Sequence, residues 1–276
     1  MKLFSQYKLI LIVAIVLTAF YNISFFKNVI TVYEFSGLNI VYIISLGIVL
    51  FLLIVFLFTV FSSKYTTKPI LIVVLMTSSF TAYFMDTYHV VIDSEMIRNS
   101  LQTNLSESAD LFSFQLVVYV LLLGVLPSFL IYKTKLEYTT FKKELLSKIA
   151  VIFVSLSFVV TTILAFSKFY TSFFREHKPL RYHVNPIYWV YSIGNYVSKT
   201  LNAGPIIVKE IGTDAKIIET NDEVDKKELM ILVVGEAARA DRLSLNGYEK
   251  QTNPLLEKED IVNFSNLYSC GTSTAH

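Results

Sequence analysis

Five long stretches without a charged residue constrain this chain more than any other feature of its sequence. They are Leu9–Phe26, Gly37–Phe61, Pro69–Met85, Leu111–Tyr132 and Ile149–Ser167. A helix of about 20 apolar residues is long enough to cross the hydrocarbon core of a bilayer. The sequence therefore predicts five transmembrane helices, of which Pro69–Met85 is the shortest.

The composition of the whole chain agrees with this prediction. Hydrophobic residues make up 54% of the sequence and charged residues 17%, which is more apolar than an ordinary soluble domain. The formal net charge is only +2, because 24 basic residues are nearly balanced by 22 acidic ones. We therefore expect a membrane-embedded protein with no nucleic-acid partner.

The lysines predict how the helices are oriented, because cytoplasmic loops are enriched in basic residues. If the N-terminus is cytoplasmic, the cytoplasmic segments hold nine lysines, whereas the opposite loops hold only Lys27 and Arg98. The nine lysines are Lys2, Lys8, Lys64, Lys68, Lys133, Lys135, Lys142, Lys143 and Lys148. The chain after the fifth helix would then lie outside the cytoplasm. The first stretch is interpreted as a retained span and not a signal peptide, because no small-x-small cleavage site follows it.

The chain divides into three parts on this interpretation. Residues 1–168 form a five-helix transmembrane domain, and residues 169–228 form an interfacial helix and a linker. Aromatic rings interleaved with cations between residues 168 and 199 are typical of the membrane–water interface, although a plain juxtamembrane linker has the same composition. The pair Asn185-Pro186 is expected to start a helix there, since proline is tolerated in a first helical turn.

Residues 229–276 alternate between strand and helix patterns. We expect strands at 229–235 and 262–268, with a helix at roughly 237–246 and a short one near Pro254–Lys258. This alternation predicts the start of a periplasmic α/β domain with a largely parallel sheet. The sequence ends at His276, before such a domain could close, so we expect the catalytic domain to be incomplete.

Two polar groups follow the predicted strands. Glu236 comes directly after the first strand, at the sheet edge where open α/β folds bind ligands, although an acid there also stabilises a helix N-terminus. The hydroxyls of Thr272, Ser273 and Thr274 follow the second strand and could either cap a helix or serve as a nucleophile. Because no nearby histidine is placed to act as a base, a metal is the better candidate to activate a hydroxyl.

A third polar group lies between the third and fourth spans. Asn99, Thr103 and Glu107 are spaced i, i+4, i+8, which places them on one face of a helix on the same side of the membrane as the α/β domain. They could bind a polar lipid headgroup or form an ordinary solvated face. The single cysteine, Cys270, lies in the exported part and either pairs with a cysteine elsewhere or remains a buried thiol.

Four segments of the sequence resemble the lipid A phosphoethanolamine transferases, bacterial inner-membrane enzymes that include the mobile colistin-resistance proteins. The segments are NSLQTNLSE, FFREHKPLRYHVNP, VVGEAARADRLSLNGY and NFSNLYSCGTSTA, so the similarity runs through most of the chain. The resemblance implies five membrane helices followed by a periplasmic domain of the alkaline-phosphatase and sulfatase type. That topology agrees with the one expected from hydropathy.

The resemblance also implies roles for individual residues. Glu236 matches a zinc ligand, and Thr274 matches the threonine that ligates zinc and attacks phosphatidylethanolamine. The phosphoethanolamine would be held on Thr274 and then passed to lipid A, which gives resistance to polymyxin and other cationic peptides. Asn99, Thr103 and Glu107 match positions that bind the lipid substrate's headgroup, and Cys270 matches a cysteine that pairs with a later one. The enzyme is expected to be a monomer.

The family's other zinc ligands, an aspartate followed by a histidine, have no counterpart in the 276 residues, so we expect this chain to be inactive by itself. Three alternatives remain. The acceptor could be Kdo, heptose or a glucan; the enzyme could be a phosphoglycerol transferase like those that make teichoic acid; or the chain could be a non-catalytic membrane protein such as a transporter. The absence of ionisable residues in the five stretches argues against a transporter.

Overall fold

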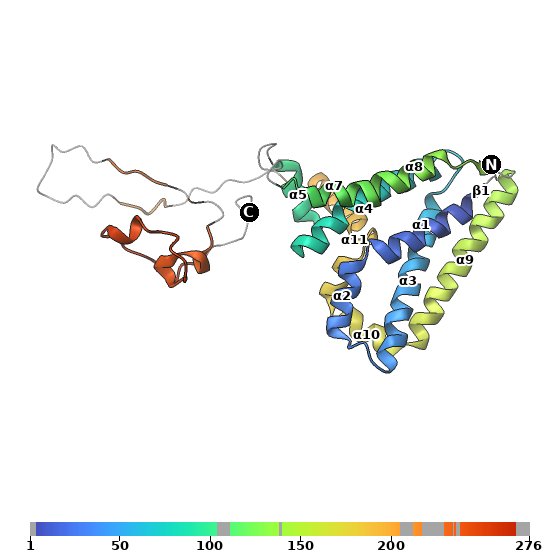
Figure 1. The fold of residues 1–276 in the computed structure, drawn as a ribbon, viewed down its shortest axis with the longest axis horizontal. Helices are drawn as coiled ribbons and strands as arrows, with labels where there is room; N and C mark the ends of the chain where they lie inside the picture. The colour runs from blue at the N-terminus through green and yellow to red at the C-terminus, as the bar shows by residue number, and fades with distance from the viewer. Residues whose placement is uncertain are drawn as a thin grey trace, which may run out of the picture. The chain divides into compact units, whose positions relative to one another are not determined.

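The structure is a computed structural model, and it describes residues 4–103, 111–137, 140–204, 212–216, 229–233, 235 and 238–268. The chain forms two compact units, one ending at Ile206 and the other beginning at Ile207. Figure 1 follows the chain from blue at the N-terminus to red at the C-terminus. The two units are described separately below.

The first unit contains four helices that are long and apolar enough to cross a membrane. They are α3 (Leu38–Phe61), α4 (Thr67–Tyr88), the run Phe114–Lys133 and α9 (Phe141–Ala165). The run Phe114–Lys133 consists of α7 (Phe114–Tyr119), the π-helical turn η1 (Val120–Val125) and α8 (Leu126–Lys133). These helices lie over four of the five predicted spans and confirm them, because side chains that are apolar all round a helix favour a lipid environment.

The first predicted span, Leu9–Phe26, is not one straight helix. α1 (Gln6–Phe20) and α2 (Ile23–Val32) meet at a bend of 53°, and together they make the fifth candidate span. The bend lies at Asn22, whose side-chain Nδ2 donates to the carbonyl oxygen of Leu17 at 2.9 Å. A side-chain amide that bonds a helix carbonyl competes with the helical ladder, which explains why the helix ends there. Apolar composition alone did not reveal this break.

The long helices pack around a shared apolar core. α9 runs beside α3 (Figure 1), while α1 lies against α3, and α4 lies against η1 and α8. Core side chains such as Leu17, Ile54 and Leu75 have no exposed surface. Gly124 in η1 allows the close approach to α4, because a Cβ atom there would lie 2.8 Å from Ser79 Oγ.

One end of this unit brings three distant parts of the chain together. β1 (Phe4–Ser5) pairs in parallel with β2 (Leu136–Glu137), with Phe4 opposite Leu136. Lys68 Nζ donates to the carbonyl oxygen of Tyr132 at 3.0 Å, and Lys148 Nζ donates to that of Ser62 at 3.0 Å. The N-terminus, the α3–α4 connection and the α8–α9 connection therefore lie on the same side, as an even number of spans between them requires.

Shorter helices complete the unit. They are α5 (Ser94–Gln102), α10 (Ser167–Arg175), the 3-10 helix η2 (Lys178–His183) and α11 (Ile187–Leu201). The helix expected after Asn185-Pro186 is confirmed as α11. The aromatic side chains of α10 do not all face outward as an interfacial segment would suggest, since Phe169, Tyr170 and Phe173 are buried. Phe169 stacks on Tyr42 of α3 with ring centroids 4.6 Å apart, which ties α10 to the helical core.

The second unit differs from the expected strand–helix alternation in its local structure. Its described residues form three short 3-10 helices, η3 (Ala240–Arg242), η4 (Ser244–Asn246) and η5 (Leu256–Lys258), in place of the helices at 237–246 and 254–258. The described parts of the predicted strands 229–235 and 262–268 form no ladder. A strand is held by hydrogen bonds to a neighbour, and none is placed beside these segments in the described part of the unit. Leu229–Val233 remain 76–91% exposed as a result.

Candidate functional site

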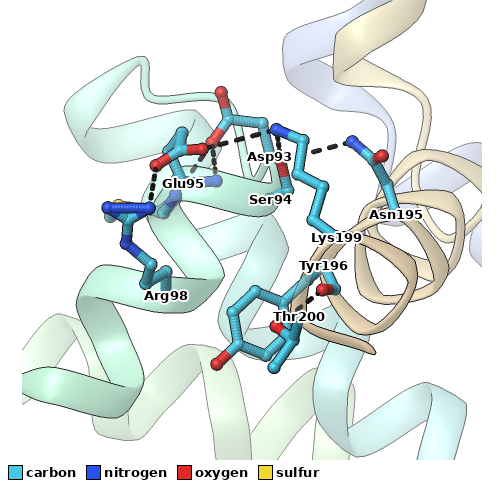
Figure 2. A network of polar contacts seen from close by, with 9 residues as sticks. Asp93, Ser94, Glu95, Arg98, Asn195, Tyr196, Lys199 and Thr200 are labelled. Atoms are coloured by element: carbon cyan, nitrogen blue, oxygen red, sulfur yellow. Dashed lines mark hydrogen bonds and ion pairs between the residues drawn. The ribbon is translucent and has the colours of Figure 1, made fainter. Parts of the chain in front are cut away.

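The best-defined polar cluster of the described residues surrounds the start of α5 (Figure 2). Asp93 caps this helix: its Oδ1 accepts hydrogen bonds from the backbone N–H groups of Glu95 at 3.1 Å and Met96 at 2.8 Å. An acid at this position satisfies two free donors and interacts favourably with the helix dipole. Glu95 in the first turn also pairs with Arg98, with 3.4 Å between Oε2 and NH1.

Two side chains of α11 hold α5 in place from the other side. Lys199 Nζ lies 3.3 Å from Ser94 Oγ and 3.5 Å from Glu95 Oε1, and Asn195 Nδ2 lies 3.3 Å from the same Ser94 oxygen. Ser94 is buried, whereas Lys199 and Glu95 are partly exposed. Figure 2 shows both α11 side chains reaching toward the N-terminal turn of α5. The α11 contacts therefore fix the helix that carries Asn99.

Asn99 and Thr103 lie next to each other at the far end of α5. The helix ends at Gln102, and Thr103 follows as the C-cap residue. The backbone N–H and the Oγ1 hydroxyl of Thr103 both donate to the carbonyl oxygen of Asn99, at 2.9 and 2.7 Å respectively. Asn99 is exposed, and its side-chain amide makes no hydrogen bond to another described residue. The i, i+4, i+8 helical face is therefore not continuous, because α5 stops before Thr103, and Glu107 lies outside the described residues.

A phenol lies close to this cluster. Burial, followed by the negative charge of Asp93, raises the pKa of Tyr188 in the first turn of α11. The Tyr188 hydroxyl can donate a hydrogen bond at neutral pH, as an ordinary phenol does. Its ring lies 5.0 Å from that of Tyr182, so an aromatic row continues from α11 into η2.

The predicted catalytic residues fall in a different part of the chain. Glu236 and the three hydroxyl residues Thr272, Ser273 and Thr274 lie outside the described residues, as does Cys270, which was expected to pair with another cysteine, so the structure does not show how close they come to one another. Among the residues that are described, no three His, Cys, Asp or Glu side chains are grouped as metal ligands usually are.

Sequence reasoning missed two hydrogen-bonded polar groups in the membrane unit. The predicted third span, Pro69–Met85, excluded Asp86, but α4 continues to Tyr88, and Asp86 Oδ1 accepts the backbone N–H of Ser24 at 3.0 Å, at the start of α2. Asn22 and Asn185 bond each other twice: Asn22 Nδ2 to Asn185 O at 2.7 Å and Asn185 N to Asn22 Oδ1 at 2.9 Å. The sequence signal for a buried hydrogen bond at Asn22 was its position as an isolated asparagine inside the apolar stretch Leu9–Phe26.

Family models match most of the chain. The model described as phosphoethanolamine transferase EptA/EptB matches residues 50–201, which include α5, α11 and the cluster of Figure 2. The sulfatase model matches residues 228–276, the segment in which an α/β catalytic domain was expected to start. The fold class predicted from the sequence, a helical membrane domain followed by the start of a sulfatase-like domain, agrees with both matches.

Similar proteins extend the same relationship. The chain is 40% identical over 275 residues to the phosphatidylethanolamine transferase Mcr-1 of Escherichia coli, and 32% identical over 281 residues to the phosphoethanolamine transferase EptA of E. coli K12. These alignments cover 99% of this chain and 51% of each relative. The solved structure of the integral membrane protein lipooligosaccharide phosphoethanolamine transferase A from Neisseria meningitidis matches all of the chain and 51% of its own, with a TM-score of 0.85 and 28% identity.

The chain thus spans about half the length of the curated relatives that it matches. The transferase model covers more than half of the 276 residues, and it takes in every long helix from α4 to α11. From this match we conclude that the chain belongs to the EptA/EptB family of phosphoethanolamine transferases.

Proposed function

We propose that this chain supplies the membrane domain and the start of the catalytic domain of a zinc-dependent enzyme that transfers phosphoethanolamine from phosphatidylethanolamine to lipid A. Residues 1–168 would form the transmembrane domain, residues 169–228 the interfacial helix and linker, and residues 229–276 the first part of the catalytic domain. The family match supports the transfer chemistry, and the names of the relatives, phosphatidylethanolamine transferase Mcr-1 and phosphoethanolamine transferase EptA, support the donor lipid and the transferred group.

The single observation that carries the proposal furthest is the fixed position of α5. The Asp93 cap and the contacts from Lys199 and Asn195 hold this short helix, while the Asn99 amide is left exposed and without a partner among the described residues. An exposed amide and a neighbouring hydroxyl on a helix that is held in place suit a phosphate or an ammonium headgroup, because the backbone that carries them is already ordered before binding. Asn99, Thr103 and Glu107 are proposed to bind the donor headgroup.

Thr274 is proposed as the nucleophile. Its Oγ would form a bond to the phosphorus of phosphatidylethanolamine while the bond from phosphorus to the diacylglycerol oxygen breaks, and diacylglycerol leaves with a proton. A phosphate oxygen of lipid A would then attack the same phosphorus and release the Thr274 hydroxyl. Zinc, when bound, would lower the pKa of the hydroxyl and neutralise charge at phosphorus. Glu236 and Thr274 offer oxygen donors of a type that zinc accepts, and they would supply two of its ligands.

We further propose that the protein is a monomer of the bacterial inner membrane, with its N-terminus in the cytoplasm and its catalytic domain in the periplasm. The lysine-rich connections support this orientation, because Lys68 and Lys148 lie at the same end as the β1–β2 pair. The opposite end carries α5, so in the proposed orientation the headgroup-binding residues would lie on the periplasmic side.

The test is to express the complete coding region that contains these 276 residues in a polymyxin-susceptible bacterium and to measure lipid A by mass spectrometry. We expect added phosphoethanolamine, reduced polymyxin susceptibility, and loss of both with Thr274→Ala but not with Thr272→Ala. Modification of another acceptor, addition of phosphoglycerol, or unchanged transfer by Thr274→Ala would each contradict the proposal. The 276 residues expressed alone are expected to add no phosphoethanolamine.

A further inference from the structure

A cavity of about 600 Å³ lies in the first unit between α3, α10, η2 and α11. α3 contributes Leu46, Leu50 and Leu53 to its wall, and α10 contributes Phe173. The wall from η2 and α11 is more polar, since it includes Arg181 and the polar-tipped side chains of Tyr182, Tyr188 and Asn195. The volume is within the range of sites that take small organic ligands.

Among the described residues that line this cavity, Arg181 is the only cation. Its guanidinium carbon lies 5.6 Å from the centre of the Tyr182 ring, and the side chain is exposed. Within the described residues, no carboxylate comes within ion-pair distance of it. Guanidinium groups bind phosphate through two parallel hydrogen bonds, so Arg181 is suited to a phosphate placed beside the apolar wall.

The surroundings indicate which ligand would bring a phosphate together with hydrocarbon. α3 is a membrane-crossing helix with apolar residues all round, and α10 begins two residues after the last membrane-crossing helix ends. The cavity therefore combines an apolar wall from a spanning helix with a cationic wall from the segment that leaves the membrane. That arrangement matches a lipid molecule at the interface, whose chain points into the bilayer and whose phosphate stays at its surface.

We propose that this cavity binds one acyl chain of a diacyl glycerophospholipid, and that Arg181 binds the phosphate of the same molecule. The site is separate from Asn99 and Thr103, and it does not depend on the transfer reaction. The two regions share α11, because Asn195 lines the cavity and also donates to Ser94 at the start of α5. A bound lipid would thus contact the helix that holds α5 in place.

The acyl-chain part of the proposal is tested by photolabelling. The 276-residue chain would be placed in nanodiscs that contain phosphatidylglycerol with a diazirine in one acyl chain, a lipid that is not the proposed donor. After irradiation, peptide mapping is expected to show strong labelling of α3 and α11. Leu53→Trp fills the cavity and should reduce that labelling several-fold. Ile48→Trp, on an exposed position of the same helix, should leave it unchanged.

The phosphate part is tested with Arg181→Gln against Arg175→Gln, a nearby exposed arginine that does not line the cavity. Loss of a charge-assisted phosphate contact is expected to weaken labelling by the phospholipid about tenfold. Labelling by a diacylglycerol that carries the same diazirine should not change, because it has no phosphate. The proposal would be overturned if both arginine variants reduced phospholipid labelling equally, or if Leu53→Trp left the labelling unchanged. Failure of phosphoethanolamine transfer would not affect it.

Discussion

Asn22 and Asn185 illustrate how much depends on single polar residues inside an apolar bundle. Both residues are 1% exposed. The side-chain amide of Asn22 donates to the backbone carbonyl of Asn185 and accepts from its backbone N–H. Asn185 Nδ2 also donates to the carbonyl oxygen of Ser78 at 3.0 Å, and Trp189 Nε1 lies 3.2 Å from Asn185 Oδ1. The bend in the first span, α4 and the start of α11 are therefore joined through one hydrogen-bonded group.

Replacing Asn22 with alanine should destabilise the membrane unit strongly. The backbone N–H and C=O of Asn185 would lose their partners while buried, and each unsatisfied group costs about 1–3 kcal/mol. Thermal unfolding in detergent measures the loss. Asn28→Ala on α2 is the matched control, since that side chain makes no hydrogen bond within the described part of the chain. Similar unfolding temperatures for the two variants would contradict the expected role of Asn22.

His183 is expected to make stability depend on pH. Burial lowers its pKa from the usual 6.5, and the neighbouring His89 lowers it further, although a hydrogen bond from Nδ1 to Pro179 O at 3.1 Å opposes the shift. A histidine whose folded-state pKa is depressed stabilises the fold fully above pH 6.5, and that contribution is lost as the pH falls through the folded-state value. The unfolding temperature should therefore fall more steeply below pH 6.5 in the parent chain than in His183→Gln.

At the scale of the elements, a glycine allows a close contact between η1 and α4. Gly124 lies so close to α4 that an added Cβ would meet Ser79 Oγ at 2.8 Å and Met76 Sδ at 3.1 Å. Gly124→Ala should destabilise the pair of helices by about 1–3 kcal/mol, as overpacking commonly does. Gly47→Ala is the control, because the nearest atom there, on Phe26, is 3.6 Å away.

A second substitution separates steric overlap from other effects at Gly124. Ser79→Ala removes the hydroxyl that the new methyl group would meet, so the double variant should recover part of the lost stability. Non-additivity of this kind is expected only for residues in contact. If the two substitutions simply add, the close approach of η1 to α4 is not what limits the residue at this position.

The contacts of Lys199 in α11 with α5 are predicted to limit local opening of α5 more than they affect the stability of the whole unit. Lys199 and Glu95 are partly exposed, and such pairs contribute only about 0.2–1 kcal/mol. Lys199→Met should therefore leave the unfolding temperature nearly unchanged while speeding hydrogen exchange over residues 94–103. Lys178→Met, which alters a lysine of η2 outside the cluster, should leave exchange in α5 as it was.

Element positions were largely predictable from the sequence, whereas their interruptions were not. Apolar runs determined α3, α4, the run Phe114–Lys133 and α9, because the need for about 20 apolar residues leaves little choice. The break at Asn22 and the inclusion of Asp86 in α4 depend on partners far along the chain, Asn185 and Ser24, which periodicity cannot supply. For the candidate site, spacing singled out Asn99 and Thr103, although α5 ends before Thr103. It did not indicate Lys199, which contacts α5 only through the packing of α11.

For the molecule as a whole, the proposed orientation makes a direct prediction about accessibility. Cys270 is the only cysteine, so Cys270→Ser gives a background on which single cysteines can be placed. Asn202→Cys, just after α11, should react with a membrane-impermeant maleimide in spheroplasts. Tyr65→Cys, which is highly exposed between α3 and α4, should react only after the membrane is opened. The reverse pattern would show that the lysine-rich end faces the periplasm.

The bond between Asn22 and Asn185 also has a consequence for the timing of biosynthesis. The two residues are 163 positions apart, so at about 5–20 residues per second the ribosome needs roughly 8–33 s to make the second after the first. During that interval the Asn22 amide lies in or beside the bilayer without its final partner, where an unsatisfied polar group is costly. The hydrogen bonds between Asn22 and Asn185 can therefore form only after the other membrane helices have been translated.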